Sequence, residues 1–147
     1  MEGFFDREVR STLAQSLGCV ALRIEDACER YFDVLSARFP ADGSKIAWNG
    51  LPKARLSIES DIILQKERFL WFFDNAVSDQ GLSGQAVYMG DSATEVAVIG
   101  DVRDIRTALS ALLEMPQHHY VMEPSGEWVM CFSMEGMMGF AFAPEGN

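Results

Sequence analysis

The sequence predicts one α+β domain over residues 1–147, with two N-terminal helices and one later helix packed on a largely antiparallel sheet. Three observations indicate this class. The chain has a common single-domain length, 48% of its residues are apolar, and strand-like and helix-like patterns alternate between Gln85 and Phe142. Neither a repeat nor an interdomain linker interrupts the sequence. We expect the helices to cover one face of the sheet.

The first forty residues predict two amphipathic helices. Apolar residues recur at every fourth position from Phe5 to Leu17, which is typical of a helix with one buried face. A second apolar stripe predicts a helix from Ile24 to Phe39, and Pro40 would stop it. Burial of both stripes against a common surface favours helices packed on a sheet.

The middle of the chain contains an edge-strand pattern and an ambiguous apolar run. Asn49-Gly50 predicts a hairpin turn, and side chains of opposite character alternate from Ala54 to Glu59. Pro52 places this strand at the edge of the sheet, because proline cannot donate a ladder hydrogen bond. The run from Phe69 to Phe73 fits a buried strand or a buried helix turn, and we favour the strand.

The stretch from Gln85 to Phe142 contains most of the predicted sheet. A helix should begin after Asp101, which is placed as its N-cap, and should end before Pro116. The strands expected around this helix are Gln85–Met89, Thr94–Ile99, Gln117–Met122, Trp128–Ser133 and Met137–Phe142.

The charge is unevenly distributed along the chain. The net charge is −10, and residues 69–147 carry eleven acidic but only two basic residues, Arg103 and Arg106. Such a field repels nucleic acid and anionic membranes and attracts basic partners. The sequence also lacks a phosphate-binding loop and a basic stripe with interleaved aromatic residues, so we expect no direct nucleic-acid contact.

Location and redox state follow from three further features. The longest apolar runs are far too short to cross a bilayer, and the N-terminus lacks a secretory signal pattern. Cys19, Cys28 and Cys131 are odd in number and are not closely spaced in pairs, which favours reduced, buried thiols. We therefore expect a cytoplasmic protein that does not bind membranes.

Two adjacent histidines, His118 and His119, are the candidates for acid–base chemistry. On a strand they would point to opposite faces, so only one of them can line a given pocket. No metal-binding spacing accompanies them, and we expect neither a metal nor another cofactor. One alternative is a small hydrolase or transferase that uses one histidine with Asp91, Ser92 or Cys131.

A resemblance to known proteins rests on Gly90–Glu95, Pro116–Tyr120 and Trp128–Gly136, which together look like segments of small bacterial α+β proteins. In size, acidity and lack of a catalytic motif the chain resembles immunity proteins of toxin–immunity systems. The resemblance covers the C-terminal third to half and carries over no residue roles. It implies an inhibitor that occludes a basic, nuclease-like toxin domain.

The function expected from these observations is that of an acidic module that binds a basic protein partner. The carboxylates proposed to contact the partner are Asp91, Glu95, Asp101, Asp104, Glu123, Glu127 and Glu135. A second alternative is a homo-oligomeric structural subunit, which predicts a large uncovered apolar patch on the monomer.

Overall fold

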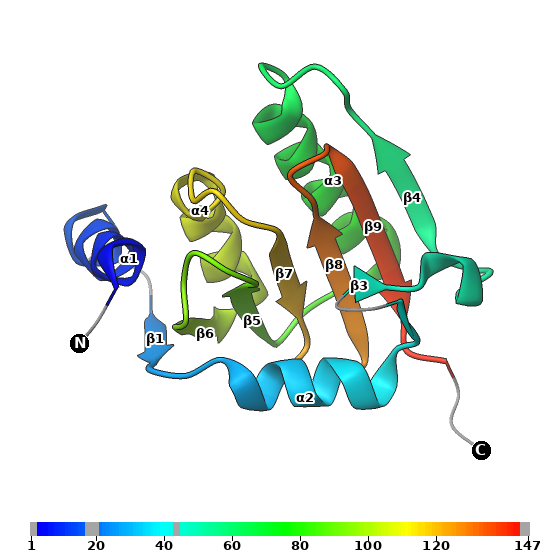
Figure 1. Cartoon of the computed structure of the whole chain (residues 1–147), viewed down its shortest axis with the longest axis horizontal. Helices are drawn as coiled ribbons and strands as arrows, with labels where there is room; N and C mark the ends of the chain where they lie inside the picture. Colours follow the sequence, from blue (N-terminus) through cyan, green and yellow to red (C-terminus); the bar gives the residue numbers. More distant parts are fainter. Residues whose placement is uncertain (1–2, 17–20, 43–44, 145–147) are drawn as a thin grey trace.

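The computed structural model describes residues 3–16, 21–42 and 45–144, which are organised around one seven-stranded sheet (Figure 1). The strand order is β1-β6-β5-β7-β8-β9-β4, and all neighbouring strands are antiparallel. The strands are β1 (Leu22–Glu25), β4 (Arg55–Ile58), β5 (Gln85–Gly90), β6 (Ala97–Asp101), β7 (His119–Met122), β8 (Trp128–Phe132) and β9 (Met137–Phe142). The α+β class and the antiparallel sheet predicted from the sequence are confirmed.

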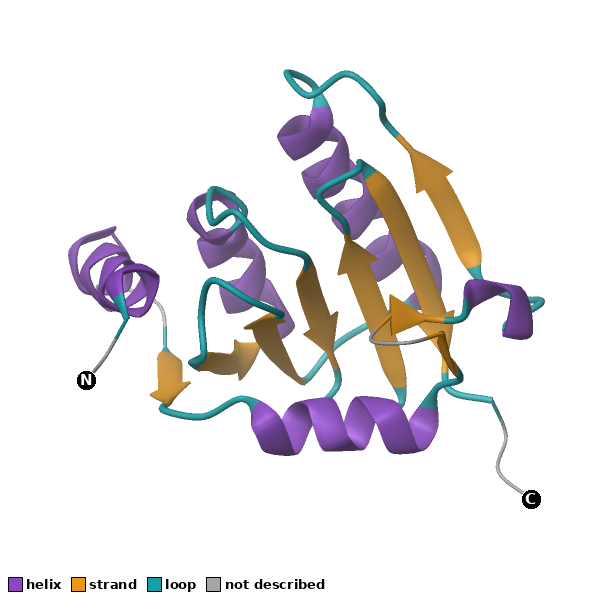
Figure 2. Ribbon diagram, in the orientation of Figure 1, coloured by secondary structure: helices purple, strands orange, loops and turns teal. Residues whose placement is uncertain are grey.

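Helices cover both faces of the sheet, which differs from the expected one-sided arrangement (Figure 2). The helices are α1 (Phe4–Ser16), α2 (Glu29–Arg38), α3 (Gln65–Gln80), α4 (Val102–Leu112) and the short 3-10 helix η1 (Trp48–Gly50). Side chains of α1, α3 and α4 pack on one face, which we call the three-helix face. Side chains of α2 pack on the opposite face, which we call the α2 face.

Strand alternation divides the core between these two faces. Tyr88 and Val121 belong to the core of the three-helix face, whereas their neighbours Met89 and Tyr120 belong to the core of the α2 face. Because successive side chains of a strand point to opposite sides, a strand buried on both faces is apolar at nearly every position. This explains why β5, β7 and β8 are almost continuously apolar.

The N-terminal helices correspond to the prediction only in part. Helix α1 forms where it was expected, although Leu17 lies outside the described residues. Ile24, placed in the second helix by its apolar spacing, lies instead on β1, where it is opposite Val98 of β6. Leu22 and Ile24 are two residues apart and both pack on the three-helix face, which is the spacing of a strand. The helix prediction was wrong there because Ile24 also continues the apolar spacing of α2.

Helix α3 was not predicted, because the run from Phe69 to Phe73 was expected to be a strand. In the structure this run lies inside a 16-residue helix. Phe69, Phe72, Phe73 and Ala76 are buried, and their spacing of three and four residues is that of a helix face. Trp71 is 61% exposed, so the apolar run from Phe69 to Phe73 is not buried throughout.

Strand β4 lies at one edge of the sheet, as Pro52 indicated, and pairs with β9. The predicted hairpin around Asn49-Gly50 is wrong. These residues belong to η1, while β3 (Lys45–Ile46) pairs with β2 (Ala41–Asp42) in a small separate sheet. Trp48 packs against the backbone of Gly139 so closely that a Cβ there would lie 2.5 Å from the indole ring. Trp48 thus packs η1 against β9.

A buried carboxylate attaches α1 to the sheet. Asp6 is only 3% exposed, and its Oδ1 accepts hydrogen bonds from the backbone N–H groups of Glu95 (2.8 Å) and Val96 (3.2 Å). Charge-assisted bonds of this kind compensate for the loss of water around the carboxylate. None of the described helices is both long and apolar enough to cross a membrane.

Candidate functional site

A buried polar network occupies the end of the sheet where β5 ends and β7 begins. Its centre is Gln117, which is 1% exposed. The Oε1 atom accepts hydrogen bonds from the backbone N–H groups of Ala93 (2.9 Å) and Thr94 (3.0 Å), and from that of Ser92 at 3.4 Å. The Nε2 atom donates to the hydroxyl oxygens of Thr94 (2.9 Å) and Tyr88 (3.1 Å). Gln117 therefore holds the loop between β5 and β6 in place.

The network continues from Tyr88 to His119. The Tyr88 hydroxyl lies 2.6 Å from Nδ1 of His119. Because this hydroxyl already accepts from Gln117, its single proton is available to Nδ1 of a neutral imidazole. Burial lowers the pKa of His119 to about 4 and raises the pKa of the Tyr88 hydroxyl. His119 is therefore a neutral hydrogen-bond acceptor inside the protein near pH 7.

His118 and His119 point to opposite faces of the sheet, as strand alternation predicted. His119 is buried on the three-helix face beside Tyr88, whereas His118 lines a pocket of about 320 Å³ on the α2 face together with Tyr120 and Cys131. Nδ1 of His118 accepts a hydrogen bond from the backbone N–H of Met134 at 2.9 Å. This bond occupies the only acceptor of a neutral His118 ring.

Cys131 shares the pocket with His118, but its thiol is not activated. Burial is the main cause that raises the pKa of Cys131 to about 12, and a hydrogen bond with Tyr120 lowers it less. In the described part of the chain, no hydrogen bond joins the Cys131 sulfur to either histidine ring. Cys28 and Cys131 are both buried free thiols, in agreement with the prediction, and Cys19 lies outside the described residues.

Ser92 and Asp91 form part of the turn rather than a nucleophile with its base. The Ser92 hydroxyl donates to Oδ1 of Asp91 at 3.2 Å, and the same oxygen accepts from the backbone N–H of His118 at 3.0 Å. Neither residue is bonded to a histidine ring among the described residues. The contacts are those of a loop in which an aspartate satisfies nearby backbone donors.

The seven carboxylates proposed from the sequence divide between the two ends of the sheet. The register pairs Gly90 with His119 and His119 with Phe132, so the loops next to these residues share one end. The carboxylates at this end are Asp91, Glu95 and Glu135. Those at the opposite end, beside the first residues of β5 and β8, are Asp101, Asp104, Glu123 and Glu127.

Two of the seven carboxylates have a cationic partner. Asp101 caps α4 through the backbone N–H of Arg103 at 2.9 Å and also lies 3.4 Å from the Arg103 guanidinium. This confirms the predicted N-cap. Glu135 lies 3.6 Å from the ammonium of Lys45 and 3.8 Å from Nδ1 of His118. Within the described residues, the carboxylates of the other five have no side-chain nitrogen of lysine, arginine or histidine within 4 Å, namely Asp91, Glu95, Asp104, Glu123 and Glu127.

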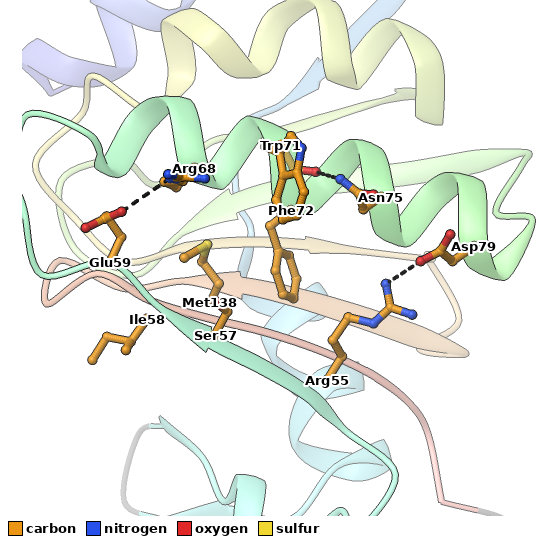
Figure 3. Close-up of a pocket in the computed structure, with 10 residues that line it drawn as sticks. All are labelled: Arg55, Ser57, Ile58, Glu59, Arg68, Trp71, Phe72, Asn75, Asp79 and Met138. Carbon is orange, nitrogen blue, oxygen red and sulfur yellow. Dashed lines mark hydrogen bonds and ion pairs between the residues drawn. The ribbon is translucent and has the colours of Figure 1, made fainter.

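A groove of about 350 Å³ between β4 and α3 was not predicted from the sequence (Figure 3). Two ion pairs cross it, from Arg55 to Asp79 at 2.9 Å and from Arg68 to Glu59 at 3.3 Å. Its floor contains Phe72 and Met138, which belong to the core of the three-helix face. The groove depends on α3, so it was missed together with that helix.

Gln117 was also missed as the centre of the polar network. Its partners are 23 to 29 residues away in the sequence, and no local pattern joins them. The only available indication was a glutamine at the start of the predicted strand Gln117–Met122. Such a residue has to be hydrogen-bonded if it is buried.

No group of three or more histidine, cysteine, aspartate or glutamate side chains is placed to hold a metal ion within the described residues. No protein-family model matches this chain, and comparison with curated proteins finds no match either.

Proposed function

We propose that this chain is an acidic protein-binding module, and that its partner presents a basic surface. The single observation that carries the proposal is the set of carboxylates without a cationic partner. In residues 69–147 both arginines are engaged, Arg103 with Asp101 and Arg106 with Asp74. Three further carboxylates of this half pair with cations of the first half, Asp79 with Arg55, Glu114 with Lys66 and Glu135 with Lys45. The five carboxylates named above that have no such partner are left to interact with an external partner.

We place the contact at the end of the sheet that carries the larger group of these carboxylates. Asp104 lies in the first turn of α4, and Glu123 and Glu127 flank the turn between β7 and β8. Asp104 and Glu127 have no hydrogen-bonded or ionic side-chain partner among the described residues, whereas Glu123 accepts bonds from Ser125 and Glu127 of its own turn. Asp104 and Glu127 are thus the side chains most available to a cation on a partner.

The finer proposal is an immunity-type inhibitor in a bacterial cytoplasm that occludes a basic toxin domain. The resemblance of the chain to immunity proteins in size, acidity and lack of a catalytic motif supports this assignment. The two buried free thiols, Cys28 and Cys131, support a reducing compartment. An inhibitor of this kind needs an electrostatically complementary surface but no catalytic group of its own.

The test uses the protein encoded next to the gene for this chain. Its association with the wild type and with an Asp104→Asn/Glu127→Gln double variant is measured at several salt concentrations. We expect the double variant to associate several-fold more slowly at low salt and to depend less on salt, because long-range steering is lost. An unchanged rate and salt dependence would refute the electrostatic contact.

A matched control is Glu67→Gln, which removes an exposed carboxylate of α3 that is not among the seven. It should leave the association rate nearly unchanged. Growth rescue tests the inhibitor assignment separately. If the neighbouring protein arrests growth when produced alone, co-production of this chain should restore growth. Binding without rescue would remove the inhibitor assignment and leave the binding module.

The hydrolase alternative is not favoured by the geometry of the two histidines. The His118 ring accepts from a backbone N–H group, and the His119 ring is buried beside Tyr88. The second alternative, a homo-oligomeric subunit, is favoured by the exposed apolar side chains of Leu56 and Ile58 on the edge strand β4.

A further inference from the structure

Exposed apolar side chains gather around one edge of the sheet. Eight large apolar side chains are exposed among the described residues, and six of them lie on β4, on the loop after it, on α3 or on the turn between β8 and β9. We call this group the β4 patch, and its members are Leu56, Ile58, Ile62, Ile63, Trp71 and Met134. Ile58 and Trp71 border the groove between β4 and α3, and Ile62 and Met134 border a second pocket. Exposed apolar patches of this kind mark interaction surfaces.

The two edge strands of the sheet are protected very differently. On the α2 face, β1 carries Arg23 and Glu25 opposite Ile99 and Ala97 of β6. Charged side chains at such positions oppose edge-to-edge pairing. At the corresponding positions of β4 the side chains are Leu56, which is 53% exposed, and Ile58, which is 69% exposed. Of the two edges, β4 is therefore the one suited to pair with another strand.

The backbone of β4 offers hydrogen-bonding groups at these same two residues. Glu59 donates its N–H to Gly136 of the turn before β9 at 2.9 Å, in the register that continues from β4. Inward and outward residues alternate along an antiparallel strand. Ser57 therefore faces β9, whereas Leu56 and Ile58 direct their N–H and C=O groups toward the open edge.

The charge around β4 permits a second copy of this acidic protein to approach. Residues 51–68 contain four basic and three acidic residues, in contrast to the strongly acidic C-terminal half. Two chains that carry a net charge of −10 each would repel one another least when this region is at the interface.

We propose that two copies of this chain pair through β4, antiparallel and around a twofold axis at Ser57. In this register Leu56 of one copy lies opposite Ile58 of the other, and the outward backbone groups of both residues are satisfied in both copies. The two sheets become one continuous sheet. The exposed Leu56 and Ile58 side chains contact each other across the axis on the α2 face.

The same register brings opposite charges together on the three-helix face. Arg55 of one copy lies opposite Glu59 of the other, and this pair occurs twice around the axis. Each of these side chains already has a partner across the groove, Asp79 for Arg55 and Arg68 for Glu59 (Figure 3). The contact thus joins the two ion pairs into one network in which positive and negative side chains alternate. This self-complementarity favours a second copy over an unrelated strand as the occupant.

The first experiment measures the mass of the protein in solution by sedimentation at several concentrations. We expect a dimer at micromolar concentrations, and a monomer for Ile58→Lys, which places a charge on the edge. Because Ile58 is 69% exposed, the variant should fold, and its circular dichroism and melting temperature check this. Glu8→Gln, an exposed change on α1, should remain dimeric. A wild type that stays monomeric at about 100 μM overturns the proposal.

The second experiment tests the register with two charge reversals. Arg55→Glu places two glutamates opposite each other, and Glu59→Arg does the same with two arginines, so each variant should dimerise about tenfold more weakly than the wild type. When the two variants are mixed, each glutamate meets an arginine of the other chain, and a heterodimer should form. If mixing restores nothing, or if both variants dimerise normally, this pairing is wrong.

The third experiment tests the axis directly. Opposed residues of a non-hydrogen-bonded pair have Cα atoms about 4.5 Å apart, within the range of a disulfide. Ser57→Cys should therefore give a covalent dimer under mild oxidation, whereas the exposed control Ser125→Cys should not. Equal cross-linking of both variants would indicate random collision and overturn the assigned axis.

Discussion

The side-chain amide of Gln117 occupies the space that a side chain on Gly90 would need. A Cβ at position 90 would lie 1.9 Å from both the amide carbon and Nε2 of Gln117. Gly90 is the last residue of β5, and Gln117 precedes β7, so their contact brings the amide next to the loop between β5 and β6. The glycine is required here for close approach, and the network around Gln117 depends on it.

We predict that Gly90→Ala lowers the free energy of unfolding by about 2 to 4 kcal/mol, because the added methyl group displaces Gln117 from its partners. Urea denaturation measures the change. Gly3→Ala is the control, since a Cβ at that position meets only Oδ2 of Asp6, at an ordinary 3.5 Å. A loss below about 0.5 kcal/mol for Gly90→Ala would mean that Gln117 can move without cost.

Gln117→Leu should destabilise the protein by a similar amount, about 2 to 4 kcal/mol, for a different reason. The apolar side chain fits the volume but leaves the N–H groups of Ala93 and Thr94 without an acceptor. Hydrogen exchange of these two amides should accelerate more than that of the amides in β8. Gln80→Leu, an exposed change near the end of α3, serves as the control. Unchanged exchange at Ala93 and Thr94 would contradict the assigned role.

The burial of neutral His119 predicts a stability that depends on pH. Its pKa is lowered from 6.5 to about 4 in the folded protein, so the unfolded chain binds the proton more readily between these values. The contribution is fully present above pH 6.5 and is lost as the pH falls toward 4, for a total of about 3 kcal/mol. His119→Asn should flatten this part of the profile, whereas His118→Asn should retain it. If the stability of the wild type and that of His119→Asn depended on pH in the same way, protonation of His119 would not be the cause of the pH dependence.

The thiol of Cys131 should be unreactive in the folded protein. Its pKa is raised to about 12 by burial, so almost no thiolate exists at pH 8. In a Cys19→Ser background, a thiol reagent should modify Cys131 only as fast as the protein opens, and at once after denaturation. Cys28, also buried and with a raised pKa, should behave in the same way. Rapid modification of Cys131 at pH 8 would instead indicate an activated thiol and revive the hydrolase alternative.

Sequence patterns predicted the antiparallel sheet because strand alternation is a local property. The five strands between Gln85 and Phe142 occur near their expected positions, although β6 begins at Ala97 rather than Thr94. The same alternation correctly separated His118 from His119. Helix α3 was missed because Trp71 is apolar although it is exposed. The run from Phe69 to Phe73 therefore contains no polar residue and looks like a buried strand.

The candidate sites were harder to predict, since they depend on contacts between distant segments. The charge imbalance could be counted directly in the sequence. The division of the seven carboxylates between two ends of the sheet could not be predicted from the sequence, because it follows from strand direction and register. Likewise, Arg55 and Asp79 carry no sequence pattern that joins them, and only the packing of α3 beside β4 brings them together.

The strand order has a consequence for the synthesis of the protein. The strands made first, β1 and β4, occupy the two edges of the sheet, and their only partners in it, β6 and β9, come from the later half of the chain. A ribosome releases the N-terminal residues first, so neither edge strand can pair until its partner has emerged. The apolar stripe of α2 therefore stays uncovered until the strands on which it packs, from the later half of the chain, have been made.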